Sequence, residues 1–130
     1  MNAVKLAAAK AFTNAKLKPS DIDVAELHDA FTILEISESE DAGFFPKGEG
    51  HLALEKGETA LGGRLPINTS GGLKARGHPV GATGVSQIVE LVWQLRGEAA
   101  GRQVQGAKRA FSCNFGGFGN NVVAFVFAKR

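Results

Sequence analysis

The chain has 130 residues, of which 44% are hydrophobic and 22% charged, and its formal net charge is +2. These values are typical of one globular domain with a single core, and the small, scattered positive charge argues against a nucleic-acid surface. A single cysteine excludes an internal disulfide and a cysteine-based metal site, and no metal is expected. Neither a signal peptide nor a membrane-length apolar run occurs, so we expect a cytoplasmic protein without membrane association.

The sequence begins with a predicted helix and a short strand. Apolar residues recur at helical spacing from about Asn2 to Leu17, on a mostly alanine face that suits close packing against a sheet. Pro19-Ser20-Asp21 ends this helix and turns the chain. Residues Val24–Leu27 are predicted to form a short strand, which places His28 at its carboxyl end.

The middle of the chain is poorer in regular structure. Residues Phe31–Glu38 are typical of a helix. The polar, glycine-rich segment Ser39–Arg64 is expected to be a long surface loop with one or two helical turns near Leu52–Lys56, and His51 is expected at its surface. Leu65-Pro66-Ile67 is predicted to be a brief extended piece.

The last part predicts a helix followed by two strands. Apolar residues at helical spacing run from Val85 to Leu95, and Gly97 ends this helix. Lys108–Cys113 and Asn121–Ala128 are predicted strands, the second apolar without alternation and so expected to be covered on both faces. The order α-β-α-β-α-β-β predicts a layered α/β domain.

Three short constellations carry side chains capable of chemistry. His78 stands between Gly77 and Pro79 within the segment from Asn68 to Gly84, where proline restricts the loop and glycine leaves the imidazole free to approach a reacting group. The other two are His28-Asp29-Ala30-Phe31 and Cys113–Gly119. In layered α/β folds ligands bind at the carboxyl ends of strands, where His28 and Cys113 are both expected.

Taken singly, these residues leave structural alternatives open. Cys113 is either the thiol of a cysteine–histidine pair, the composition used for acyl transfer, or a buried inert cysteine. His28 is either catalytic or a hydrogen-bonded structural histidine, and Asp29 either holds its ring or caps the next helix. The glycines after Cys113 either form a hairpin turn or direct backbone N–H groups toward an oxyanion.

Together and in this order, the three constellations resemble the carboxyl-terminal part of a thiolase over nearly the whole chain. The glycine-histidine-proline stretch with its flanking glycines is highly specific to that family. The His28-Asp29 pair, in place of the commoner asparagine-glutamate pair, resembles the sterol-carrier-type and archaeal branch. The resemblance implies an α/β fold layered α-β-α with a mixed sheet, in which residues 1–130 form one carboxyl-terminal thiolase domain.

The resemblance also implies roles for individual residues. His78 activates the nucleophilic cysteine and helps form an oxyanion hole, His28 supplies the other part of that hole through a water, and Cys113 is the general acid and base for the substrate's alpha carbon. Phe115 replaces the glycine that lines a second oxyanion hole in many thiolases, which makes Gly116 its substitute. The other residues expected at the site are Asn68 and Gly117 in the loops, and Phe31, Ser70, Gly71, Gly77 and Pro79 at the substrate.

Several parts of a thiolase have no counterpart in these residues. A thiolase consists of two similar halves with its nucleophilic cysteine in the first half, and Cys113 matches the acid/base cysteine of the second. The resemblance further implies that a central strand before the first helix and much of the coenzyme-binding insertion are missing. A sheet without a central strand exposes an apolar edge or gap that favours pairing with another chain. We therefore expect a split subunit or a fragment, inactive alone, that needs a first-half partner and associates into an oligomer.

The implied chemistry is acyl exchange between coenzyme A thioesters, either thiolysis of a 3-oxoacyl-CoA or the reverse Claisen condensation. Acyl-CoA is then the substrate, and no cofactor is expected. Two alternatives remain. The first is a component of a thiolase-like aldolase, a class that lacks the usual cysteines, so that Cys113 argues against it. The second is a non-catalytic assembly module with the thiolase fold. The resemblance to the archaeal and sterol-carrier branches also implies a small zinc-ribbon/OB-fold protein as a candidate partner.

Overall fold

The fold is built on a three-stranded sheet, seen in a computed structural model that describes residues 1–129. The strands are β1 (Val24–Glu26), β2 (Arg109–Gly116) and β3 (Asn121–Ala128), in the order β1-β2-β3. β1 runs parallel to β2, and β3 runs antiparallel to it, so the sheet is mixed as expected. Ile67 forms an isolated parallel bridge with Ala25, so the predicted extended piece at 65–67 adds a bridge and not a fourth strand to the sheet.

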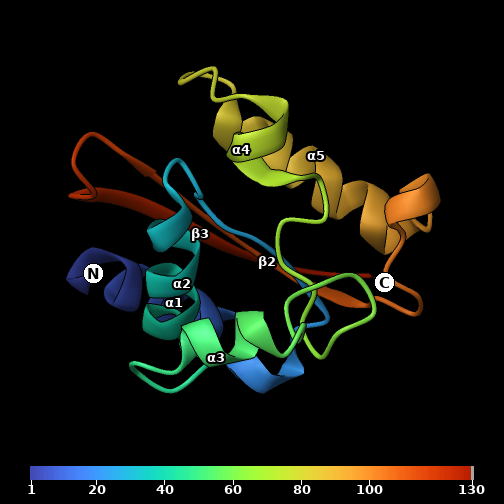
Figure 1. The fold of residues 1–130 in the computed structure, drawn as a ribbon, viewed down its shortest axis with the longest axis horizontal. Coiled ribbons are helices and arrows are strands. Elements are labelled where there is room, and N and C mark those ends of the chain that lie inside the picture. The colour runs from blue at the N-terminus through green and yellow to red at the C-terminus, as the bar shows by residue number, and fades with distance from the viewer. Residues whose placement is uncertain (130) are drawn as a thin grey trace.

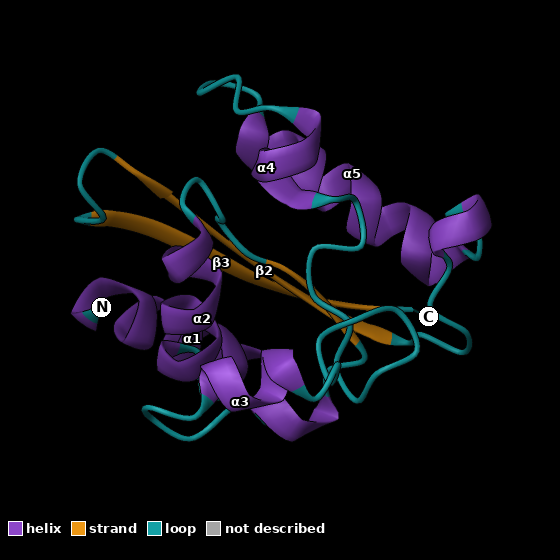
Figure 2. Ribbon diagram, viewed as in Figure 1, coloured by secondary structure: helices purple, strands orange, loops and turns teal. Residues whose placement is uncertain are grey.

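Helices cover both faces of the sheet. Figure 1 shows α4 and α5 on one side of the strands and α1, α2 and α3 on the other, and Figure 2 shows the same layers by element type. The expected α/β class with α-β-α layers is confirmed. The helices are α1 (Asn2–Ala15), α2 (Thr32–Asp41), α3 (Gly50–Glu55), α4 (Gly72–Arg76) and α5 (Thr83–Arg96), with 3-10 turns at Pro19–Asp21 and Ala100–Arg102.

Both long helices lie where their apolar spacing predicted them, but α5 leaves Val85 and Val89 of that predicted face exposed. In α1, Val4, Ala8 and Phe12 recur every four residues and are buried, so the small side chains allow the helix to pack on β3. α5 packs on β1 and β2 and ends at Gly97, whose φ of 81° is the left-handed conformation that glycine adopts without strain. No helix among residues 1–129 is long and apolar enough to cross a membrane.

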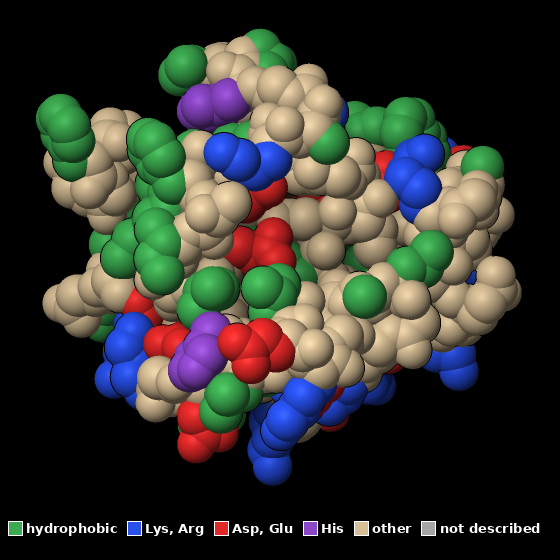
Figure 3. Space-filling view, viewed as in Figure 1, with side chains coloured by type: hydrophobic (Ala, Val, Ile, Leu, Met, Phe, Trp, Pro, Cys, Tyr) green, Lys and Arg blue, Asp and Glu red, His purple; other side chains and the backbone are tan. Residues whose placement is uncertain are grey.

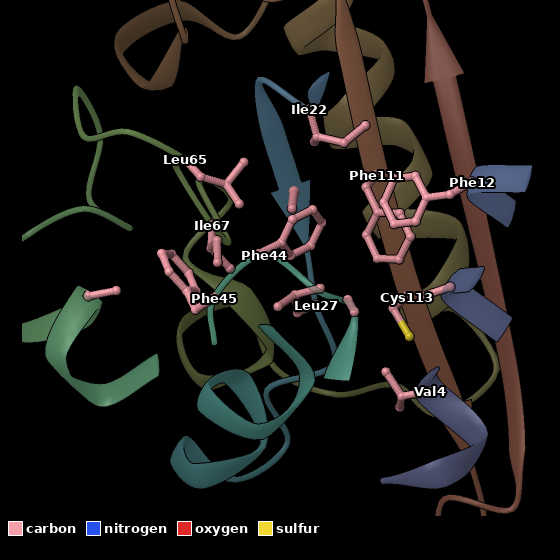
Figure 4. Close-up of a cluster of buried hydrophobic side chains, with 14 residues drawn as sticks. Val4, Phe12, Ile22, Leu27, Phe44, Phe45, Leu65, Ile67, Phe111 and Cys113 are labelled. Atoms are coloured by element: carbon pink, nitrogen blue, oxygen red, sulfur yellow. The ribbon is translucent and has the colours of Figure 1, made fainter. Parts of the chain in front are cut away.

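The main core lies between the sheet and α1–α3. Figure 4 shows its central aromatic group, in which the rings of Phe12 and Phe111 stack with centroids 5.2 Å apart and Phe44 meets Phe111 edge to face. A smaller cluster on the other face joins Leu91 of α5 to Val24 and Ala110 of the strands. Both sides of β1 and β2 are thus buried, which fixes the positions of the loops that follow these strands.

One expectation about the sheet is wrong. No strand precedes α1, as expected, and β1 and β2 pair directly without a gap, so the unpaired edge among the described strands is the outer edge of β3. Contrary to expectation, β3 is not covered on both faces. Alternate residues of β3 pack toward α1, whereas Val123 and Phe125 on the other face remain 47% and 44% exposed. The apolar side chains on this second face of β3 therefore have no cover within residues 1–129.

The segment between β1 and α5 contains more helix than expected. α2 continues to Asp41, α3 takes up the turns predicted near residues 52–56, and α4 was not foreseen. α4 has only five residues, and its sequence Gly-Leu-Lys-Ala-Arg gives no apolar periodicity to detect. It is held instead by tertiary contacts, since the backbone N–H of Leu73 donates to Asp29 Oδ1 at 2.7 Å.

Candidate active site

The fold brings the two predicted site histidines into contact. His28 follows β1 at its carboxyl end, and His78 lies in the loop between α4 and α5. Their rings meet edge to face with centroids 4.9 Å apart. His28 is buried, with 3% of its surface exposed, whereas His78 is exposed. One imidazole is therefore fixed inside the domain and the other reaches its surface, at the edge of the sheet where ligands of α/β folds bind.

His28 is held from several directions. Its backbone N–H donates to Glu38 Oε2 at 3.0 Å, and its ring Nδ1 lies 2.6 Å from Asn114 Oδ1. The Phe115 ring packs against the imidazole with centroids 4.3 Å apart. Burial lowers the pKa of His28, and the neighbouring His78 acts in the same direction, while Asn114 and Asp29 oppose the shift. Burial of His28 therefore favours the neutral imidazole.

The loop that carries His78 leaves its ring exposed and holds the backbone on both sides of it. Gly77 has a φ of 87°, a left-handed value that favours glycine, and Pro79 fixes the backbone on the other side. The first residue of α5, Thr83, is fully buried, and its Oγ1 lies 2.7 Å from His78 Nδ1. The same hydroxyl reaches the Pro79 carbonyl at 3.2 Å. Gly77, Pro79 and Thr83 thus orient His78 and leave its Nε2 directed away from this contact.

Three other predicted residues support the site and do not line it. The Asn68 side chain accepts from the Leu27 N–H at 2.8 Å and donates to Glu35 at 2.7 Å, so it ties the segment before His28 in place. Ser70 Oγ donates to the buried carboxylate of Glu26 at 2.7 Å. Gly71 has a φ of 90° and precedes α4. These contacts are structural, and they stabilise the loop that leads to His78.

The remaining loop residues lie at the rim. Phe31, which precedes α2, is 68% exposed, and Gly116 and Gly117 lie at the start of the exposed β2–β3 turn. Gly117 has a φ of 58°, so the glycine there satisfies the turn. Figure 3 shows hydrophobic side chains over this hairpin and over the segment that leads into α2. The rim of the candidate site is therefore apolar.

Cys113 does not join the two histidines. Successive residues of a strand point to opposite faces, and Cys113 points into the main core, where it is fully buried. Figure 4 shows its side chain in the same cluster as Val4 and Leu27. Burial raises the pKa of its thiol far above the ordinary value, and the adjacent Glu38 carboxyl raises it further. The acid/base role expected for Cys113 is not supported by this position.

The residues that sequence reasoning missed are Asn114, Thr83 and Glu38. Asn114 contacts the His28 ring. The sequence points instead to the preceding residue, Cys113, as the member of the site. The strand pattern contained the signal, because Phe111 and Cys113 alternate with Ser112 and Asn114 as apolar and polar faces. Thr83 contacts His78, which lies 5 residues before it, and Glu38 contacts His28, which lies 10 residues before it. No sequence pattern indicates either contact.

Two hollows adjoin the site and differ in character. One, of about 330 Å³, lies between α2, α3 and α4 and contains the Asp29 and Glu35 carboxyl groups, and Figure 3 shows acidic side chains in the hollow below α4. The other, of about 250 Å³, lies between α5 and β3 and is lined by Asn114 and by apolar side chains, among them Val85 and Phe125. Lys74 stands with the two carboxyl groups in the lining of the first hollow, whereas the described lining of the α5–β3 groove contains no charged side chain and so suits an apolar occupant. Within residues 1–129, no group of three or more His, Cys, Asp or Glu side chains is placed to hold a metal ion.

Two buried carboxyl groups predict a pH-dependent stability. Burial raises the pKa of Glu26 to about 7 and that of Glu38 to about 8. Between their ordinary values and these raised values the folded state binds more protons than the unfolded state, so stability falls as the pH rises. From pH 6.5 to pH 8.5 we expect the free energy of unfolding to fall on the order of 2 kcal/mol.

Urea unfolding of the whole chain at the two pH values measures this fall. Glu38→Gln should remove most of the slope, whereas Glu55→Gln, on the exposed part of α3, should leave it unchanged. A wild-type stability that rises between pH 6.5 and 8.5 would contradict the burial of protonated carboxyl groups.

Comparisons with known proteins agree with this geometry. The family described as "Thiolase C-terminal domain-like" matches residues 1–129. An acetyl-CoA acetyltransferase of Methanothermobacter thermautotrophicus is 54% identical over 123 residues, which are 95% of this chain and 32% of that protein. Human sterol carrier protein 2 is 50% identical over 123 residues, 95% of this chain and 22% of the relative. The chain thus spans a third or less of the length of these two relatives.

A solved structure has the same fold. The complex named Ltp2-ChsH2(DUF35) aldolase contains a chain that matches with a TM-score of 0.82 and 30% sequence identity, over 98% of this chain and 32% of that one. The two comparisons thus point to different reactions, since one relative is described as an acetyltransferase and a structural neighbour as an aldolase.

Proposed function

The chain belongs to the family of thiolase C-terminal domains, and on that premise we propose that it is the second-half component of a coenzyme A acyltransferase. The observation that carries this proposal is the contact between His28 and His78, with the His78 ring exposed and oriented by Thr83. Two imidazoles that converge at a surface, in a chain without an accessible thiol among residues 1–129, are suited to act on a nucleophile that another polypeptide supplies.

The proposed reaction is thiolysis of a 3-oxoacyl-CoA or its reverse. His78 Nε2 takes the proton from the partner's thiol as its sulfur bonds to the 3-oxo carbon. The bond between that carbon and the alpha carbon then breaks, and its electron pair forms the enolate of acetyl-CoA. The proton held by His78 is returned to the alpha carbon, and free coenzyme A releases the acyl group from the partner's sulfur. Donors around the enolate oxygen, including a water on His28, supply the electrostatic stabilisation.

The partner is proposed to cover the apolar face formed by α5 and β3. α5 exposes Val85, Val89 and Trp93 along one stripe, and β3 exposes Val123 and Phe125 beside it. The α5–β3 groove connects this face to Asn114, next to His28. Because the chain spans 32% of the acetyltransferase relative, the occupant we propose is the remaining part of a thiolase. Val80 and Gly81 of the His78 loop also line this groove, so an occupant of the groove lies next to that loop.

A retro-aldol reaction is the second candidate, and two observations favour it. The structural neighbour is described as an aldolase, and the buried position of Cys113 removes the argument that this cysteine gave against aldol chemistry. In such a reaction the same histidines would move the proton of a 3-hydroxyl group as the carbon–carbon bond breaks. A second, smaller component, such as a zinc-ribbon/OB-fold protein, is then an additional proposed partner.

Reconstitution tests the proposal. The purified chain is mixed with the polypeptide encoded just upstream, and thiolysis of acetoacetyl-CoA is measured for each part and for the mixture. We expect activity only in the mixture. Cleavage of a 3-hydroxyacyl-CoA without thiolysis would favour the aldolase. Binding without either reaction would favour a non-catalytic assembly module, and full activity from this chain alone would overturn the proposal.

A further inference from the structure

Asn114 makes a side-chain contact with His28 that its place in a hairpin strand does not require. It lies near the carboxyl end of β2, on the face that carries Ser112 and looks toward α5. Its Oδ1 is 2.6 Å from His28 Nδ1, the shortest polar contact of that ring among the described residues. The space for its amide depends on Gly84, because a Cβ there would come within 3.1 Å of Asn114 Nδ2. The first turn of α5 therefore accommodates this side chain.

The contact determines which nitrogen of His28 carries the proton. An amide oxygen only accepts hydrogen bonds, so a bond to Asn114 Oδ1 requires His28 to be protonated at Nδ1. In the neutral ring Nε2 then holds a lone pair and accepts. The Thr83 hydroxyl donates its one hydrogen to the Pro79 carbonyl at 3.2 Å, so it accepts from Nδ1–H of His78 and leaves Nε2 of a neutral His78 ring as an acceptor. Asn114 thus acts on His28 as Thr83 acts on His78.

Other neighbours of His28 fix its place without choosing a tautomer. Glu38 binds the backbone N–H, Phe115 covers the ring, and His78 meets its edge. The charged or titratable groups that face it are Asp29, Glu38 and His78, and none of them has a recorded hydrogen bond to the imidazole nitrogens. The protonation pattern of the ring therefore depends on the residue at position 114.

We propose that Asn114 is a positioning residue that holds His28 as the Nδ1–H tautomer, with Nε2 as an acceptor beside His78. This inference rests on the proposed function for its catalytic meaning. An acceptor at Nε2 takes one hydrogen of a water and directs the other toward the thioester oxygen, so His28 contributes to the oxyanion hole through that water. The opposite tautomer would place an N–H at this point and leave the water without its acceptor.

The tautomer can be measured on this chain without a partner. Long-range proton–nitrogen spectra of the whole chain, labelled with ¹⁵N-histidine, report which ring nitrogen of His28 is protonated. We expect the Nδ1–H pattern in the wild type. Asn114→Asp should keep this pattern and raise the pKa of His28, because a carboxylate stabilises the imidazolium. Asn114→Leu should shift His28 toward the Nε2–H form. Asn120→Asp, the same change outside the site, should alter neither.

The kinetic readout uses the reconstituted enzyme. Asn114→Leu should lower kcat about 10- to 100-fold with little change in KM, and Asn114→Asp should retain more of kcat than Asn114→Leu. An Nε2–H pattern in the wild type, or an unchanged His28 pKa in a folded Asn114→Asp variant, would overturn the inference even if Asn114→Leu fails to fold. An Nδ1–H pattern in a chain that never supports thiolysis would instead leave the placement correct and refute the proposed function.

Discussion

The kcat of the reconstituted enzyme should fall at least about 10³-fold when His78 is replaced by alanine. His78 is the exposed member of the histidine pair, so it is the group that reaches a thiol on another polypeptide. Without it the thiol keeps its proton, and one donor to the enolate oxygen is lost as well. Because the ring is exposed, its removal should leave the free energy of unfolding nearly unchanged.

The chain offers a matched control for this variant. His51 is also exposed, lies on α3, and has no recorded contact with His28 or His78. His51→Ala should retain wild-type turnover of acetoacetyl-CoA in the same mixture, and circular dichroism should show both variants folded. A His78→Ala enzyme within tenfold of wild type would show that the glycine-histidine-proline loop does not carry the base.

Phe125→Asp should strongly weaken assembly while leaving the isolated chain folded. Phe125 stands on the uncovered face of β3, 44% exposed, beside the stripe on α5. A charge at the centre of a buried apolar interface costs on the order of 2 kcal/mol or more, which weakens binding at least about 30-fold. Activity of the mixture should fall in parallel at limiting partner concentration.

Calorimetric titration of the upstream polypeptide into each variant measures this loss of affinity. The control is Leu6→Asp, which introduces the same charge at an exposed apolar position of α1, in the opposite helical layer. It should bind the partner with unchanged affinity. An unchanged dissociation constant for Phe125→Asp would show that the α5–β3 face is not the docking surface.

The fold was largely predictable because its main elements have strong periodic signals. Apolar residues at helical spacing located α1 and α5, although Val85 and Val89 of the predicted α5 face are exposed. The apolar strands at residues 109–116 and 121–128 were placed within a few residues. The periodicity did not show which element, if any, packs against each face of a helix or strand. The continuous apolar character of β3 predicts burial on two sides, whereas Val123 and Phe125 are uncovered among the described residues.

The candidate site was predictable in part. His28 and His78 could be found because each stands in a distinctive motif next to a strand or helix end. The error at Cys113 arose from a single residue of strand register, since a shift by one position moves a side chain to the opposite face of a sheet. Contacts such as Asn114 with His28 join residues 86 positions apart, and they become visible only when β1 and β2 lie side by side.

The central proposal is that this chain supplies histidines to a nucleophile that lies outside residues 1–130, in the first half of a thiolase. The most direct test is to incubate the chain and its upstream partner with acetyl-CoA, quench with acid, and locate the transferred acetyl group by mass spectrometry of the intact polypeptides. The account predicts one acetyl group on the partner and none on this chain, with transfer slowed by His78→Ala. An acetyl group on Cys113 would contradict it, because that thiol would then be the nucleophile that its buried position excludes.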